Sequence, residues 1–172
     1  MPPEAPGDTS LTVLLMRVSG LTLAIRQRDV VEILPVPRLA VVPEAPSVLA
    51  GAFQLAGDLV LVLRMATLLG LPAKAEGDPL YHHLLLLPAQ AGRPKLALLV
   101  DRATDILEAA ATILPPGESF NDCVDGEIRI EGALVPLLAA SRLLTADEAA
   151  RTEAFAARAV AREAAFSAPG VA

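Results

Sequence analysis

Short runs of apolar residues, bounded by glycine, proline or charged residues, fill the chain between positions 11 and 144. Residues 11–18 and 21–25 flank Ser19-Gly20, a two-residue turn of the type that joins hairpin strands. Residues 48–55 and 59–63 form two further runs around a second turn. Runs of this length between turn signals predict short β-strands.

Other segments predict connectors and helical turns. The mixed spacing in residues 28–34 predicts one helical turn leading into a strand, which Pro35 and Pro37 end. A proline-rich connector then extends to residue 46. Residues 65–70 predict a short helix closed by Gly70.

After a linker at residues 72–79, the order of elements begins again, and residues 81–87 and 95–100 predict a second pair of strands. Shifting the sequence by 73 positions places residues 23–25 on 96–98 and residues 32–34 on 105–107. Shifting it by 75 positions aligns Gly51, Phe53, Leu55, Gly57, Leu59, Val60, Val62, Leu63, Leu68 and Leu69 with Gly126, Ile128, Ile130, Gly132, Leu134, Val135, Leu137, Leu138, Leu143 and Leu144. An aliphatic-rich chain aligns with itself by chance, but two glycines and a whole strand–turn–strand–helix series at one offset indicate an internal duplication.

The duplication predicts a mainly β protein with two tandem five-stranded barrels packed together and short helices after strands. Each half is small, and closing it into a barrel removes exposed strand edges. We place the paired barrels in residues 11–144, the first at about 11–71 and the second at about 80–144, with crossing over of terminal segments left open. Residues 1–10 and 167–172 are expected to be loose tails.

A different texture begins at residue 145 and predicts a C-terminal α-helix over 145–166. Thr145 and Glu148 have the spacing of a capping box, and the alanine, glutamate and arginine residues that follow favour helix. Phe155 and Phe166 are eleven residues apart, which is three turns and one face. We expect this face to pack on the second barrel, and presentation to a partner is the alternative.

Charge and composition narrow the classes of partner. The chain has 53% hydrophobic residues, a net charge of −6, no Trp and one Tyr. It therefore repels phosphate backbones and lacks an aromatic platform for bases, so nucleic acid is not expected as a partner. The N-terminus lacks the order of a signal peptide, and the apolar stretches are too short to span a bilayer. We expect a cytoplasmic protein without direct membrane insertion.

No residue pattern predicts an enzyme, a cofactor or a metal site. His82 and His83 are neighbours in a predicted strand, so their side chains point to opposite faces, one ring exposed, and cannot chelate one ion together. Cys123 stands alone and is expected to be a small buried thiol. None of the usual metal, phosphate or nucleophile motifs is present in the sequence.

Two charged clusters have simple interpretations. The charges in residues 101–108 suit a solvated helical turn with local ion pairs. Asp122, Asp125 and Glu127 form a looser acidic group in a predicted turn, and their spacing is not that of a calcium loop.

Taken together, the segments at 14–25, 29–34, 50–57, 59–65 and 96–107 are similar in order and spacing to the CheW-like domain family. The resemblance covers about residues 11–144. It implies two intimately packed five-stranded barrels resembling SH3 domains and no enzymatic activity. Members of that family couple chemoreceptor tips to the histidine kinase CheA, whose regulatory domain shares the fold. The barrels of adaptor and kinase contact each other end to end, an arrangement that can close into rings.

The central motif of the family, Asn-Leu-Arg-Gly followed by a strand close to Val-Pro-Val-Val-Asp-Leu, is altered here. Gln54-Leu55-Ala56-Gly57 occupies the first part, and Gly57 is retained because the turn requires a positive φ. Ala56 replaces the motif Arg, and Arg64 replaces the motif Asp, so a local Arg–Asp interaction cannot form. Glu32, in the segment linked to kinase and receptor contacts, matches the family.

The resemblance implies a non-catalytic adaptor with two partners, the regulatory domain of a CheA-like kinase and a methyl-accepting chemoreceptor tip, and ring or dimer assembly. One alternative is a divergent scaffold in a non-chemotaxis array or with a different partner. A small enzyme or ligand-binding barrel is the remote alternative, which a deep pocket with convergent polar groups would favour. The expected partner-binding surface comprises two edge segments and the cleft between the barrels: Glu32, Ile33, Leu34, Gly51, Phe53, Gln54, Ala56, Gly57 and Arg64.

Overall fold

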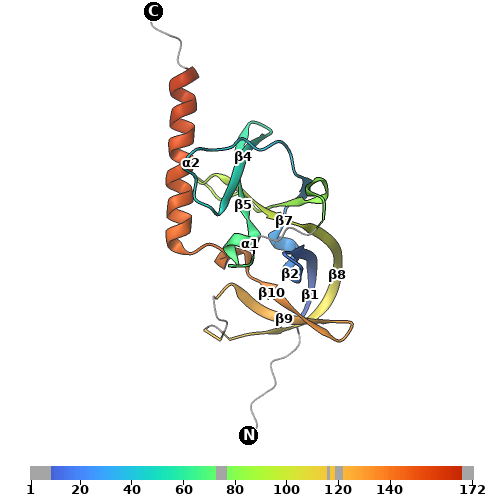
Figure 1. Ribbon diagram of the computed structural model, residues 1–172. Coiled ribbons are helices and arrows are strands. Elements are labelled where there is room, and N and C mark those ends of the chain that lie inside the picture. The colour runs from blue at the N-terminus through green and yellow to red at the C-terminus, as the bar shows by residue number, and fades with distance from the viewer. Residues whose placement is uncertain (1–8, 73–76, 116, 119–121, 168–172) are drawn as a thin grey trace, which may run out of the picture.

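The fold was analysed in a computed structural model that describes residues 9–72, 77–115, 117–118 and 122–167. Two groups of strands lie against each other, and a long helix runs along one of them (Figure 1). The strands are β1 (Thr9–Val18), β2 (Leu21–Arg26), β3 (Glu32–Pro35), β4 (Leu49–Leu55), β5 (Asp58–Arg64), β6 (His83–Leu86), β7 (Lys95–Val100), β8 (Arg102–Ile113), β9 (Val124–Ile130) and β10 (Ala133–Leu138). The helical segments are η1 (Gln27–Asp29), α1 (Met65–Leu68), η2 (Pro79–Tyr81), η3 (Ala140–Arg142) and α2 (Ala146–Ser167).

The strands form a closed barrel in the order β1-β2-β10-β9-β8, here barrel A, and a five-stranded sheet in the order β3-β6-β7-β5-β4, here sheet B. Barrel A thus contains two strands of the first half and three of the second half. Sheet B contains three strands of the first half and two of the second half. The two layers are therefore not the contiguous segments 11–71 and 80–144, and the strands are exchanged between the halves, a crossing over that the sequence left open.

Short connections explain the exchange. Only Asp101 separates β7 from β8, so the chain passes almost straight from sheet B into barrel A. Residues 27–31 connect β2 to β3 in the same way, from barrel A to sheet B. An antiparallel return needs a turn, and a strand that continues without one cannot fold back beside its own predecessor. Each half must therefore complete the barrel of the other.

The predicted duplication is visible in the register of the strands. In the β4–β5 hairpin Gly51 pairs with Val62, and in the β9–β10 hairpin Gly126 pairs with Leu137, both at the offset of 75. The two hairpins also shift register at equivalent places. Parallel pairing follows the same rule, because β5 pairs with β7 and β10 pairs with β2. The two halves are thus related in three dimensions as well as in sequence.

Both faces of the central strands are buried, which explains their nearly continuous apolar sequences. On β1, Val13 and Leu15 belong to the core inside barrel A, and Leu14 and Met16 belong to a second core. This second core lies between barrel A and sheet B and also contains Phe155 of α2. A third core fills the inside of sheet B. Alternate residues of one strand therefore hold together two layers.

The symmetry is broken where β3 meets β4. Strand β8 is 12 residues long and pairs with β9, whereas β3 is 4 residues long and has no ladder with β4. Pro35 and Pro37 follow at this point, and proline cannot donate to a ladder. Among the described residues, an isolated bridge between Ala40 and Ala52 is the only strand pairing at this seam.

Several local expectations need correction. Asp105 and Glu108 lie on β8 and pair with β1, not on a helical turn, because the ladder with β1 outweighs local charge spacing. Asp125 and Glu127 lie on β9, not in a turn. Strand β1 begins at Thr9, within the predicted tail, because it pairs with the far end of β8. The rest of the predicted tails, 1–8 and 168–172, lies outside the described residues.

The C-terminal helix begins as predicted. The Thr145 backbone N–H donates to the Glu148 carboxylate at 2.8 Å, and the Glu148 N–H donates to the Thr145 hydroxyl at 3.3 Å, which completes the capping box. Phe155 is buried in the core between the layers, and the side chain of Phe166 lies outside the described residues. The helix follows sheet B (Figure 1), so the surface that it covers includes β5 of the first half.

One histidine joins the two layers. His83, at the start of β6, accepts a hydrogen bond through Nδ1 from the backbone N–H of Ala103 on β8, at 3.0 Å. His82 precedes the strand, and both rings are half-buried, so neither is the exposed strand ring that was expected. Burial lowers the pKa of His83 below its usual 6.5, and Arg102 and His82 lower the pKa further.

Glycine is required where strands approach closely. A Cβ on Gly126 would lie 2.6 Å from the carbonyl oxygen of Thr112, and a Cβ on the equivalent Gly51 would lie 2.8 Å from that of Ala40. We therefore predict that Gly126→Ala lowers the free energy of unfolding by about 1–3 kcal/mol. Urea unfolding would measure it, with exposed Ala110→Ser as the control that changes little. An unchanged midpoint for Gly126→Ala would contradict this packing.

The pH dependence of stability should depend on His83. Its pKa is lower in the folded state, so the stability that neutral His83 supports is complete above pH 6.5 and is lost as pH falls through the folded-state pKa. We expect His83→Asn, whose side-chain oxygen can accept but not titrate, to reduce the loss of stability between pH 7.5 and 5.5. Urea unfolding at both pH values checks this, with Leu80→Ala, at an exposed side chain that does not titrate, as the control that should lose as much stability as the wild type. Equal losses in the wild type and His83→Asn would refute the role of this bond.

Candidate functional site

The nine residues of the predicted partner surface lie on sheet B and its turns. Strands β3 and β4 are at opposite ends of its strand order, but the sheet curls and brings them together. Leu34 on β3 and Phe53 on β4 pack on the same internal core. Both side chains are half-buried, so each supports the sheet and leaves part of its surface exposed. Gly51 is also buried, against the backbone near Ala40.

The exposed part of β3 is a compact apolar and acidic edge. Val31 is 62% exposed and Ile33 is 37% exposed, and Glu32 between them is exposed as well. The backbone continues the ladder, because the Val31 N–H donates to the carbonyl of Leu86 at 2.8 Å. Sequence analysis missed Val31, although its place beside Glu32 in an otherwise apolar run was a usable signal. We define residues 31–33 as the β3 edge.

The turn between β4 and β5 presents a small surface. Ala56 and Gly57 have φ values of 52° and 89°, as in a two-residue hairpin turn, which bears out the expected positive φ at Gly57. A Cβ added to Gly57 would meet nothing within 4 Å, so the turn is open to solvent. Gln54 and Ala56 are exposed there. The side chain of Ala56 can supply contact area but no charge.

Arg64 is used within the chain. Its guanidinium Nη1 donates to the carbonyl of Ser47 at 2.8 Å and to that of Leu49 at 2.6 Å. These bonds hold the end of β5 to the connector that leads into β4. Ala56 and Arg64 lie at opposite ends of the seven-residue strand β5. No local interaction was expected between these two motif positions, and the strand also separates them in space.

An acidic side chain that the sequence analysis placed in a turn links the halves of barrel A. Asp125 on β9 forms ion pairs with Arg26 on β2 and with Arg142 on η3, the latter at 2.6 Å. The carboxylate is only 18% exposed, so losing either partner would leave a poorly solvated charge. Arg26 is distant in sequence, which is why local spacing gave no signal for this cluster.

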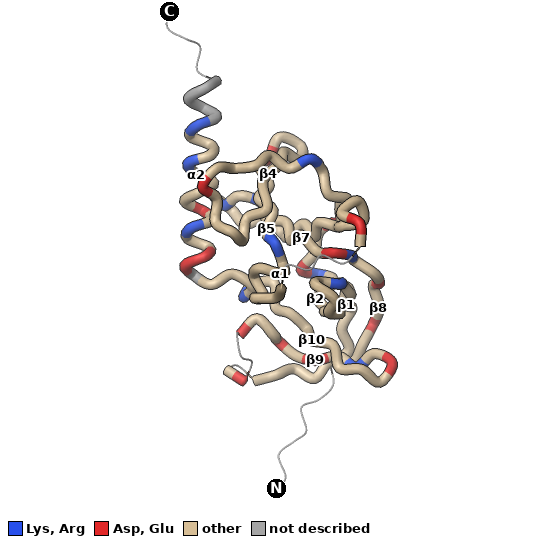
Figure 2. The backbone as a smooth tube through the Cα atoms, in the orientation of Figure 1, with Lys and Arg blue, Asp and Glu red and all other residues tan. Residues whose placement is uncertain are grey.

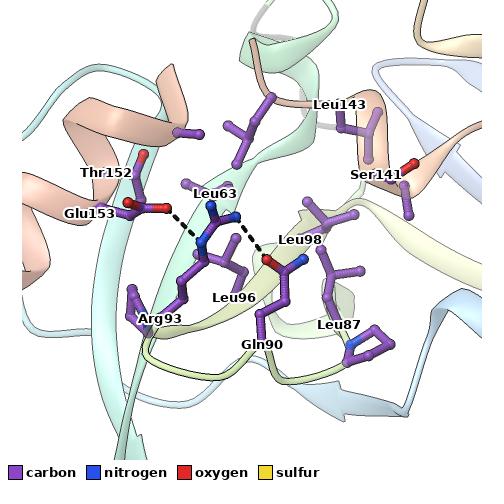
Figure 3. Close-up of a pocket in the computed structure, with 15 residues that line it drawn as sticks. Leu63, Leu87, Gln90, Arg93, Leu96, Leu98, Ser141, Leu143, Thr152 and Glu153 are labelled. Atoms are coloured by element: carbon purple, nitrogen blue, oxygen red, sulfur yellow. Dashed lines mark hydrogen bonds and ion pairs between the residues drawn. The ribbon is translucent and has the colours of Figure 1, made fainter. Parts of the chain in front are cut away.

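A small apolar pocket of about 130 Å³ lies beside α2, between sheet B and η3 (Figure 3). Leu63, Leu98 and Leu143 line it. Arg93 closes one side by pairing with Gln90 at 2.8 Å and with Glu153 of α2 at 2.9 Å. These polar groups bind one another and do not converge on the cavity. The pocket therefore lacks the arrangement that a ligand-binding barrel would need.

The charges are spread widely. Lysine and arginine are scattered over both layers and α2 in Figure 2 and do not gather on one face. In the part of the chain that the structure describes, no group of three or more His, Cys, Asp or Glu residues could hold a metal ion. Within the same residues, no helix is long and apolar enough to cross a membrane.

Comparisons with known proteins agree on one family. The sequence model described as "CheW-like domain" matches residues 12–148. No curated protein matched the chain. A structural match is the crystal structure of the scaffolding protein TtCheW from Thermoanaerobacter tengcongensis, with a TM-score of 0.65 and 15% identity, covering 76% of this chain and 90% of that chain. This similarity shows a shared fold, and the family match covers most of the chain. The chain therefore belongs to the CheW-like domain family, whose members are non-catalytic scaffolding adaptors of chemotaxis.

Proposed function

We propose that this chain is an adaptor that couples chemoreceptors to a CheA-type histidine kinase through protein–protein contacts. The observation that carries the proposal is the β3 edge, in which exposed Val31, Glu32 and Ile33 lie together on a member of the CheW-like family. Its partners are the regulatory domain of the kinase and the tip of a methyl-accepting receptor. The adaptor acts in the cytoplasm, at receptor arrays in the membrane, and joins rings through its barrel ends.

The chemistry of the β3 edge suits a protein partner. Two exposed branched aliphatic side chains supply apolar area, and a partner that covers them removes that area from water. Glu32 lies between them and can pair with an Arg or Lys of the partner, which favours one orientation over others. The free side of β3 can also add a strand, although Pro35 limits such an addition to the residues before it.

A second candidate is a divergent scaffold that binds a different protein partner. It is favoured by the loss of both charged motif side chains. Ala56 offers no guanidinium at the exposed turn, and Arg64 is committed to the carbonyls of Ser47 and Leu49. The exposed surface near the turn therefore differs from that implied by the family motif.

The first candidate predicts that the chain binds a CheA-type regulatory domain and that Glu32→Lys weakens this binding at least tenfold. Reversing the charge removes the expected ion pair and repels its partner, while an exposed side chain can change without unfolding the sheet. Isothermal titration calorimetry measures the dissociation constant. Leu80→Lys, at a side chain that is 84% exposed, is the control and should bind like the wild type. The proposal would be overturned if the wild type bound neither this domain nor a receptor tip.

Restoring the motif arginine separates the two candidates. Ala56 is exposed at positive φ, and arginine there would meet the same backbone strain as alanine, so Ala56→Arg should fold normally. If the kinase domain is the partner, Ala56→Arg should increase affinity for it by restoring a charged contact. The same titration measures the affinity of Ala56→Arg for the kinase domain. An unchanged affinity would contradict the second candidate, in which the altered motif is the reason for a different partner.

A further inference from the structure

Barrel A is closed by only a short ladder where β2 lies beside β10. In sheet B the equivalent parallel pair, β5 with β7, is aligned over five residues, from Val60 with Lys95 to Arg64 with Leu99. In barrel A only Leu137 with Ala24 and the next pair remain. Pro136 precedes them and has no N–H to continue the ladder. The first halves of β2 and β10 therefore leave an open seam.

This seam is an apolar groove, which we name the β2–β10 groove. Its volume is about 430 Å³. Leu21 and Leu134 flank it and are 48% and 57% exposed. Leu15 and Val135, which belong to the core inside barrel A, form its floor. The groove therefore presents exposed leucines above a buried apolar floor, an arrangement typical of a docking surface.

The duplication shows what this kind of surface binds. Leu134 is equivalent to Leu59 at the offset of 75, and Leu23 is equivalent to Leu96 at the offset of 73. On sheet B, Leu59 and Leu96 are half-buried in the cluster that contains Phe155 of α2. On barrel A, Leu23 is buried in that same cluster, whereas Leu134 is 57% exposed. The helix therefore covers Leu59 on sheet B, whereas the equivalent Leu134 is uncovered on barrel A.

The contacts of α2 define the chemistry of such a helix. Leu59 shares a groove with Ala156 and Val160, so the side of α2 that faces the sheet has small and branched aliphatic residues. Figure 3 shows the N-terminal part of α2 beside Leu63 and Leu96, with Glu153 paired to Arg93. A small-residue stripe lets the helix lie close, and an ion pair at the rim fixes its position.

Among the residues that the structure describes, no second long helix covers barrel A. The segment equivalent to the start of α2 is the linker after α1. At the beginning of this linker, the Ser19 hydroxyl donates a hydrogen bond to the carbonyl of Pro72. On the far side of the linker, Gly77 and Asp78 lie beside Arg17 and not in the groove. None of the described residues of the linker lines the β2–β10 groove.

We infer that the β2–β10 groove binds an amphipathic helix of a partner protein, with a stripe of small and aliphatic residues and a Lys or Arg at its edge. The basic residue follows from the rim. Sheet B offers Arg93 to an acidic residue of α2, whereas the groove of barrel A is lined by exposed Glu131. Charge complementarity therefore requires the opposite sign. This surface is separate from the β3 edge, so the inference stands apart from the kinase interaction.

The test uses two synthetic peptides of residues 145–167, the natural sequence and a Glu153→Lys form, each labelled with fluorescein and titrated with the full chain. Both carry the stripe of α2, and the second also carries the basic edge. We expect saturable binding, tighter for the Glu153→Lys peptide. Leu134→Arg in the protein should weaken binding at least tenfold, and Glu131→Lys should reverse the preference between the peptides. Leu80→Arg is the matched control and should change neither affinity.

The location of binding is read independently from backbone amide shifts of the isotope-labelled protein. Shifts centred on Leu21 and Leu134 support the inference. Shifts centred on Leu59 and Leu96 would mean that the peptide replaces α2 on sheet B and would overturn it, as would the lack of saturation or equal binding to the wild type and Leu134→Arg. Because neither readout uses a kinase or receptor, failure here leaves the adaptor proposal unaffected, and failure of kinase binding leaves this inference unaffected.

Discussion

Four strand pairings join the first half of the chain to the second: the parallel pairs β2 with β10 and β5 with β7, and the antiparallel pairs β1 with β8 and β3 with β6. Neither layer can form without them, because each contains strands from both halves. The short connections through Asp101 and residues 27–31 make this exchange unavoidable. The exchanged strands then place apolar side chains on both faces, so the core between the layers is continuous with the strands that build each layer. Within barrel A, the ion pair of Asp125 with Arg26 adds a polar link between the two halves of the chain.

An adaptor built in this way has a rigid body and three places where its symmetry fails. Proline residues shorten β3 and leave the exposed edge at Val31 to Ile33. Pro136 shortens the β2–β10 ladder and leaves an apolar groove. The helix α2 covers the surface of sheet B that corresponds to that groove. A duplicated unit thereby acquires different surfaces on its two halves, which allows one small protein to hold more than one partner without a catalytic centre.

The sequence was a good guide wherever structure depends on neighbouring residues. The Ser19-Gly20 hairpin, the capping box at Thr145 and the equivalence of Gly51 and Gly126 were all predictable, because turn geometry, helix caps and close backbone approach leave local signals. Pairing between distant segments leaves no local signal. The repeat shows which strands are equivalent, but it does not show whether a strand pairs with the partner strand of its own half or with the equivalent strand of the other half.

The same limit explains the errors at the candidate site. Leu34 and Phe53 are half-buried against one core because curling brings together two strands whose contact is not encoded in either segment alone. Charge spacing suggested a helical turn at Asp105, but pairing with β1 decides its conformation. Arg64 makes its hydrogen bonds to the carbonyls of Ser47 and Leu49, which the motif comparison did not indicate.

The strand exchange is tested most directly by separating the halves. Fragments 1–72 and 77–172 can be prepared alone and mixed, and thermal unfolding of each sample followed by far-ultraviolet circular dichroism. The exchange predicts no cooperative transition for either fragment and recovery of a transition in the mixture. A cooperative transition for fragment 1–72 alone would show that the first half closes on itself and would contradict this account.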